Sequence, residues 1–64
     1  MSFVKATYEG PGGIFTAHKS AGNGTGWITG IPTGETETRY IGGRGSIADA
    51  IDAAIKLANG EARP

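Results

Sequence analysis

Residues 46–60 decide the fold, and they read SIADAIDAAIKLANG. Isoleucines recur there at intervals of four with a narrow polar stripe opposite them, which is the pattern of an amphipathic helix. Ser46 precedes the repeat and Asp49 follows three residues later, as in a capping box, while Gly60 is a residue that commonly ends a helix. The sequence therefore predicts a helix over residues 47–59.

The apolar arc of this helix is wider than one small sheet covers. The stripe expected to face the sheet consists of isoleucines and alanines at helical spacing, namely Ile47, Ile51, Ile55, Ala54 and Ala58. Ala50, Ala53 and Leu57 extend the apolar side beyond half of the circumference. This excess indicates a second contact surface; the alternative is that alanine serves only as a strong helix former in water.

The residues before the helix form a half of the chain that is rich in glycine and threonine. Apolar runs broken by Gly-, Pro- and Asn-rich turns predict short strands over residues 2–8, 13–20, 26–31 and 36–41. Short connections make neighbouring strands antiparallel. We expect an α+β fold, a small antiparallel β-meander of three to four strands with one C-terminal helix packed on one face. Residues 1–64 form one domain with a β-rich part over 2–41, because neither half buries its apolar face alone.

Side chains alternate along a strand, so each predicted strand has two faces. One face carries small and apolar residues that leave room for the helix: Val4, Ala6, Tyr8, Phe15, Ala17, Ile28 and Gly30. The other face mixes large apolar groups with threonines: Ile14, Thr16, His18, Trp27, Thr29, Ile31, Thr36, Thr38 and Tyr40. The second face suits a contact surface better than a water-facing one. A register shifted by one residue would instead make the Trp27 face the core.

Composition excludes several classes of function. Six Lys and Arg residues balance six Asp and Glu residues, so no basic excess attracts nucleic acid or a membrane. The chain has no cysteine, which excludes disulfides, zinc knuckles and thiol nucleophiles. His18 is the only imidazole, so we expect no catalytic residue, no metal and no cofactor. With neither a signal peptide nor a membrane-spanning run in the sequence, the expected location is the cytoplasm.

The entry into the helix is rich in glycine. Residues 43–48 match the G-x-G-x-x-A form of the dinucleotide fingerprint. In that case Gly43, Arg44, Gly45 and Ser46 would hold an anion at the positive end of the helix. A dinucleotide site requires a βαβ unit, and no strand pattern follows the helix. We therefore favour a flexible connection with an ordinary N-cap.

Two motifs resemble the β-β-β-α domain of HicB-type antitoxins. The first is residues 26–32, GWITGIP, and the second is Gly45-Ser46 at the start of the Ala-rich helix. The resemblance covers residues 13–58, but residues 32–36 replace the acidic Pro–Gly loop of that family, and no DNA-binding segment follows the helix. It implies a non-catalytic, oligomeric module that binds and blocks a partner protein, without autoregulation through DNA.

We predict a non-enzymatic protein-interaction module, a self-associating inhibitor or antitoxin-like regulator that forms a homodimer and binds an unidentified protein. The predicted contact residues are the large apolar ones outside the expected core, namely Trp27, Ile14, Ile31, Tyr40 and Leu57. The alternative is a module that binds single-stranded nucleic acid or a phosphate ligand. It would use Trp27, Tyr40, Arg39 and Arg44 together with the Gly-rich helix entry. The zero net charge disfavours this alternative.

Overall fold

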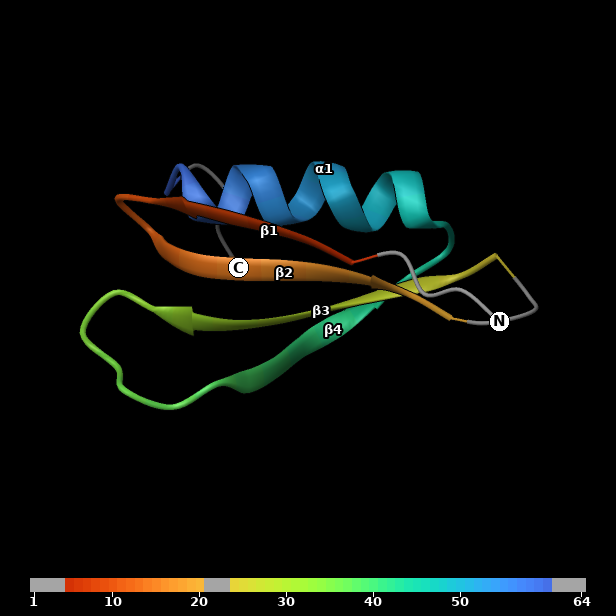
Figure 1. Ribbon diagram of the computed structural model, residues 1–64. Coiled ribbons are helices and arrows are strands. Elements are labelled where there is room, and N and C mark those ends of the chain that lie inside the picture. Colours follow the sequence, from red (N-terminus) through yellow and green to blue (C-terminus); the bar gives the residue numbers. More distant parts are fainter. Residues whose placement is uncertain (1–4, 21–23, 61–64) are drawn as a thin grey trace.

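The computed structural model describes residues 5–20 and 24–60, and these residues form four strands and one helix (Figure 1). The elements in chain order are β1 (Lys5–Gly10), β2 (Gly13–Lys19), β3 (Gly26–Pro32), β4 (Arg39–Arg44) and α1 (Ile47–Ala58). The strands lie in the sheet in the order β1-β2-β3-β4, and each neighbouring pair is antiparallel. The helix lies along one face of the sheet. This architecture confirms the predicted α+β meander.

The strand boundaries differ from the prediction, by one residue at the ends of β2 and β3 and by more in β1 and β4. The first strand was expected to start at residue 2, but residues 1–4 lie outside the described residues, and β1 continues to Gly10. The fourth strand begins at Arg39 rather than Thr36 and runs through two glycines to Arg44. Thr36 and Thr38 therefore lie in the exposed β3–β4 connection and not on the sheet, so that part of the prediction was wrong. Glycine carries no side-chain pattern, which is why the strand was not recognised beyond residue 41.

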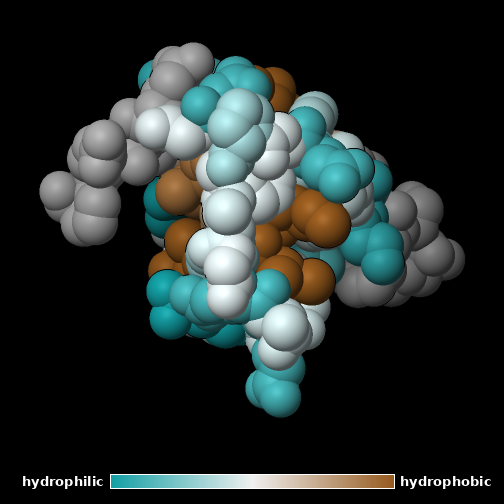
Figure 2. Space-filling view, turned by 90° about the vertical axis from the view of Figure 1, so that its left-hand side faces the viewer, coloured by the Kyte–Doolittle hydropathy of each residue, from teal (hydrophilic) through white to brown (hydrophobic). Residues whose placement is uncertain are grey.

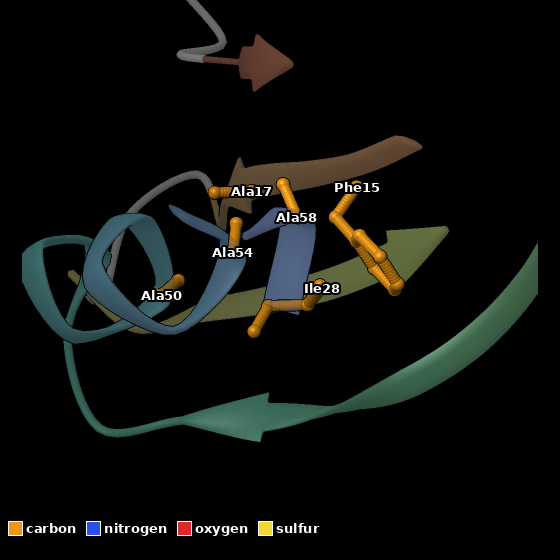
Figure 3. Close-up of a cluster of buried hydrophobic side chains, with 6 residues drawn as sticks. All are labelled: Phe15, Ala17, Ile28, Ala50, Ala54 and Ala58. Atoms are coloured by element: carbon orange, nitrogen blue, oxygen red, sulfur yellow. The ribbon is translucent and has the colours of Figure 1, made fainter. Parts of the chain in front are cut away.

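The core lies between α1 and the two central strands (Figure 3). Its fully buried members come from β2, β3 and one ridge of the helix: Phe15, Ala17, Ile28, Ala50, Ala54 and Ala58. The face that holds Phe15, Ala17 and Ile28 was predicted to meet the helix, and this assignment is confirmed. The alternative register, with Trp27 in the core, is wrong.

The helix meets the sheet mainly with alanines, and Ile47 and Ile51 pack at the margin of the core while Ile55 does not. Ala50, Ala54 and Ala58 have at most 2% of their surface exposed, whereas Ile55 is 37% exposed. The predicted placement of Ile55 against the sheet was therefore wrong. Small side chains let the helix approach the strands closely. A Cβ added at Gly26 would lie 3.0 Å from the Cβ of Ala50.

Phe15 fills the space above Gly30, its cross-strand partner. A Cβ added at Gly30 would overlap Cδ1 of the Phe15 ring and lie 2.8 Å from its Cε1. The expectation that Gly30 leaves room for the helix was wrong, because the aromatic ring of the neighbouring strand occupies that room. The absence of a side chain at Gly30 leaves space for the ring of Phe15, which is 3% exposed.

The β1–β2 turn closes the C-terminal end of α1. The backbone N–H of Gly12 donates a hydrogen bond of 2.8 Å to the carbonyl oxygen of Ala58. A Cβ added at Gly12 would overlap the carbonyl oxygen of Leu57. Gly60 follows with a φ of 77°, and its N–H donates to Leu57, as expected of a glycine that ends a helix. The turn thus satisfies a carbonyl that a helix end leaves without an intrahelical partner.

Candidate functional site

The face of the sheet opposite α1 carries the predicted contact surface. Within residues 5–20 and 24–60, no helix or strand covers this face (Figure 1). We call it the open face, and define it by the described strand residues that alternate with the core positions. They are Lys5, Thr7, Glu9, Ile14, Thr16, His18, Trp27, Thr29, Ile31 and Tyr40.

In the described part of the chain, α1 is too short and too polar to cross a membrane.

The strand register arranges the open face in three rows across the sheet. The aromatic row consists of Lys5, His18 and Trp27. The threonine row follows with Thr7, Thr16 and Thr29, and ends at Tyr40 on β4. The aliphatic row consists of Glu9, Ile14 and Ile31. The threonine row therefore separates the aromatic row, which carries the positive charge of Lys5, from the aliphatic row, which carries the negative charge of Glu9.

His18 and Trp27 form a stacked pair within the aromatic row. Their ring centroids lie 5.0 Å apart and their planes differ by 7°. The Nε2 atom of His18 also lies 2.8 Å from the hydroxyl oxygen of Thr29. Burial and, to a smaller extent, the positive charge of Lys5 lower the pKa of His18 below its ordinary value of 6.5. The imidazole is therefore largely uncharged at neutral pH.

Sequence reasoning placed His18 on this face but did not identify it as a contact residue. The missed signal lay in the hairpin. Residues of β2 and β3 that pair across it have numbers that sum to 45, and His18 with Trp27 and Ile14 with Ile31 are such pairs. Counting outward from the turn would have predicted both pairs.

The predicted contact residues fall into two groups. Ile14 and Tyr40 are 38% and 65% exposed on the open face, and Trp27 and Ile31 are half-buried there. Leu57 lies on α1, at the opposite side of the sheet, and packs against the core. The structure therefore brings the first four together and separates Leu57 from them.

The end of the molecule near the aliphatic row also exposes apolar surface. Figure 2 looks onto the end that carries the β1–β2 turn and the β3–β4 connection, and it shows hydrophobic surface between hydrophilic residues. The pair Ile14 and Ile31 lies next to the pair Gly13 and Pro32 at this end of the sheet. Hydrophobic contacts are thus available beyond the centre of the open face.

Tyr40 lies near the aromatic row. A Cβ added at Gly43 would lie 3.4 Å from the Tyr40 hydroxyl oxygen. Gly43 pairs with Trp27 across the β3–β4 ladder. Tyr40 is thus directed along β4 toward the position beside the indole, and a bulge between Ile28 and Thr29 sets the register at this point.

The Gly-rich helix entry serves the fold in two ways. Gly43 and Arg44 belong to β4, and Ser46 is the N-cap, with its hydroxyl oxygen accepting a 3.1 Å hydrogen bond from the backbone N–H of Asp49. The guanidinium of Arg44 donates a 2.7 Å bond from Nη1 to the carbonyl oxygen of Gly43. The N-cap prediction is confirmed. Anion binding by Gly43, Arg44, Gly45 and Ser46 stays a prediction.

Charged side chains do not gather into a metal site or an acid–base site in the described part of the chain. No group of three or more His, Cys, Asp or Glu residues there is placed to hold a metal ion. Arg39 pairs with Glu35 at 3.5 Å and Lys56 with Asp52 at 3.2 Å, both as exposed i,i+4 pairs. Exposed pairs of this kind contribute little to stability.

Comparison of this chain with known proteins identifies no relative. No protein-family model, curated protein or solved structure matches this chain. The resemblance to HicB-type antitoxins therefore rests on its two sequence motifs and stays a prediction.

Proposed function

We propose that this chain is a non-enzymatic protein-interaction module that binds a protein partner through the open face. One observation carries the proposal: Ile14, Trp27, Ile31 and Tyr40 share a face that no described element covers. Covering apolar surface is favourable by about 25 cal/mol per Å². Tryptophan and tyrosine are also the residues that most often dominate the energy of protein interfaces.

The polar groups of the open face favour burial under a protein surface. The hydroxyl groups of Thr7 and Thr16 lie 3.0 Å apart in a mutual hydrogen bond, and His18 bonds Thr29. A buried polar group costs most when its hydrogen bond is lost, and these groups keep their partners within the chain. A partner therefore needs to supply only apolar surface over much of this area.

The charges argue against the nucleic-acid alternative. Tyr40 is 65% exposed beside Trp27 on an antiparallel sheet, which is the feature that suits base stacking. However, Lys5 and Glu9 cancel on this face, and Arg39 and Arg44 are engaged by Glu35 and by a backbone carbonyl. Binding of nucleic acid requires several cations directed at phosphates. We therefore favour a protein partner, and the blocking of that partner is the role that the antitoxin resemblance supports.

A photo-crosslinking amino acid in place of Tyr40 tests the proposal in cells of the native host. The matched control carries the same amino acid in place of Ala48, which is exposed on the helix. We expect crosslinks to protein, either to a second copy or to another chain, from position 40 and not from position 48. Crosslinks to nucleic acid alone, or equal yields from both positions, would contradict the proposal.

A titration with single-stranded oligonucleotide tests the alternative directly. Trp27 reports on the open face, so its fluorescence is measured at two salt concentrations. We expect no quenching. Quenching that weakens at the higher salt concentration would favour nucleic-acid binding.

A further inference from the structure

We propose that the open face binds a second copy of this chain, face to face, about a two-fold axis that runs across the strands along the threonine row. The inference rests on the proposed function, because it requires the open face to bind protein. It adds the identity of the partner and the register of the contact.

The axis follows from the arrangement of the rows. A two-fold axis in the plane between the sheets and perpendicular to the strands sets every strand over its own copy, with the direction reversed. The threonine row then faces itself, and the aromatic row faces the aliphatic row of the partner. Trp27 packs on Ile31 of the partner subunit, and His18 packs on Ile14 of the partner subunit. In both contacts an aromatic ring meets an aliphatic side chain, and the threonine row lies at the centre of the interface.

Charge selects the same arrangement. Lys5 and Glu9 are the charged residues of the open face among the described residues, and they occupy opposite ends of β1. Reversal of the strand direction sets Lys5 against Glu9 of the partner subunit, and the symmetry makes this pair occur twice. An axis parallel to the strands would set β1 over β4, where Lys5 would face Gly43 and have no opposite charge. Of these two axes, only the first pairs both charges of the open face.

The dimensions suit a modest dimer. Strands about 4.8 Å apart with a rise of about 3.3 Å per residue give the sheet a face of roughly 19 by 20 Å. Stable interfaces bury about 800 Å² of accessible surface on each partner, and smaller ones are transient. The open face covers about 380 Å² in outline, about half of that area, so we expect a transient dimer with a dissociation constant in the upper micromolar range. Two sheets that pack in this way are about 10 Å apart.

Charge reversal with rescue tests the arrangement in the full-length chain. Sedimentation equilibrium over micromolar to millimolar concentrations gives the dissociation constant of the 6.5 kDa chain. Lys5→Glu alone and Glu9→Lys alone should each weaken the dimer by about tenfold, because each places like charges together twice. The double variant restores opposite charges at both contacts and should return the constant to within about twofold of the parent. Circular dichroism checks that each variant is folded.

A second measurement uses the absence of cysteine from the sequence. Thr7 lies on the proposed axis and is exposed, so Thr7→Cys should place two thiols opposite each other across the interface. A short bis-maleimide should then link two chains at high yield. Ala48→Cys, on the exposed side of the helix, is the control and should give little linkage.

The outcomes separate the two proposals. A chain that stays monomeric at millimolar concentration overturns the second-copy inference, and the proposed function stands if position 40 still crosslinks another protein. The register is overturned if the double charge variant dimerises no more tightly than the single variants. It is also overturned if the Thr7→Cys and Ala48→Cys variants give equal yields of linked chains. Failure of position 40 to crosslink any protein overturns the proposed function itself.

Discussion

Replacement of Gly12 by alanine should destabilise the fold through the contact between the β1–β2 turn and the end of α1. The Cβ of an alanine would overlap the carbonyl oxygen of Leu57 and lie 2.9 Å from the backbone nitrogen of Gly60. These are backbone atoms, so no side-chain rotation relieves the overlap. Gly12 does not have a positive φ, so the effect comes from contact and not from backbone conformation.

The magnitude follows from three contributions. Overpacking of this kind costs about 1–3 kcal/mol. Movement of the turn also weakens the 2.8 Å bond from Gly12 to Ala58, and a hydrogen bond contributes about 0.5–1.5 kcal/mol. Alanine loses less chain entropy than glycine on folding, which offsets about 0.4–1 kcal/mol. The net loss of unfolding free energy is about 0.5–4 kcal/mol, a large share of the stability of so small a domain.

Thermal unfolding followed by circular dichroism measures this effect. A loss of 1 kcal/mol lowers the Tm of a domain of this size by about 4–8 °C, so we expect a decrease of roughly 10 °C. Gly45→Ala is the matched control, because a Cβ there meets no atom within 4 Å and φ is not positive. Its Tm should not fall and should rise by about 2–8 °C, because alanine loses less chain entropy than glycine on folding. Equal Tm values for the two variants would refute the claim that the turn abuts the helix end.

Three further predictions concern the helix and the aromatic row. Ser46→Ala removes the N-cap bond and should lower the unfolding free energy by about 1 kcal/mol in urea denaturation, and an unchanged midpoint would contradict the cap. Ala54→Leu overpacks a position with 0% exposure and should lower the unfolding free energy by about 1–3 kcal/mol in the same assay. The control Ile55→Leu, at an exposed position, should lower it by less than about 1 kcal/mol. Equal losses in the two variants would contradict the burial of the alanine ridge. The lowered pKa of His18 means that its contribution to stability is present above pH 6.5 and is lost as the pH falls through that lowered pKa. The fall in stability between pH 7 and 5 should be shallower in His18→Phe, which keeps a ring beside Trp27, and identical slopes would disprove the assignment.

Much of the fold could be predicted because its signals are local. The helix follows from apolar spacing within one segment, and Ser46 caps the backbone three residues away. The assignment of Phe15 and Ile28 to the core face follows from alternation along single strands. The position of β4 was misjudged because Gly42 and Gly43 carry no pattern, and it is pairing with β3 that holds them extended.

The candidate site was predictable in its members and not in its arrangement. Alternation alone put Ile14, Trp27 and Ile31 on one face, and an exposed Tyr40 joined them. The stacking of His18 on Trp27 depends on the register between two strands, which a reading of each strand alone does not supply. Leu57 lies on the helix side and packs partly against the core, so its role in contacts stays a prediction; a helical stripe shows which residues are apolar but not which of them reach the sheet.

The sequence by itself determined the order of elements, the helix cap and the side of β1, β2 and β3 that turns toward the helix. These depend on contacts between residues that are near in the chain. The tertiary structure decided that Ala54 and not Ile55 meets the sheet, that Phe15 covers Gly30, and that His18 stacks on Trp27. Each of these depends on how closely two elements approach and in which register, and the packing of distant segments sets both.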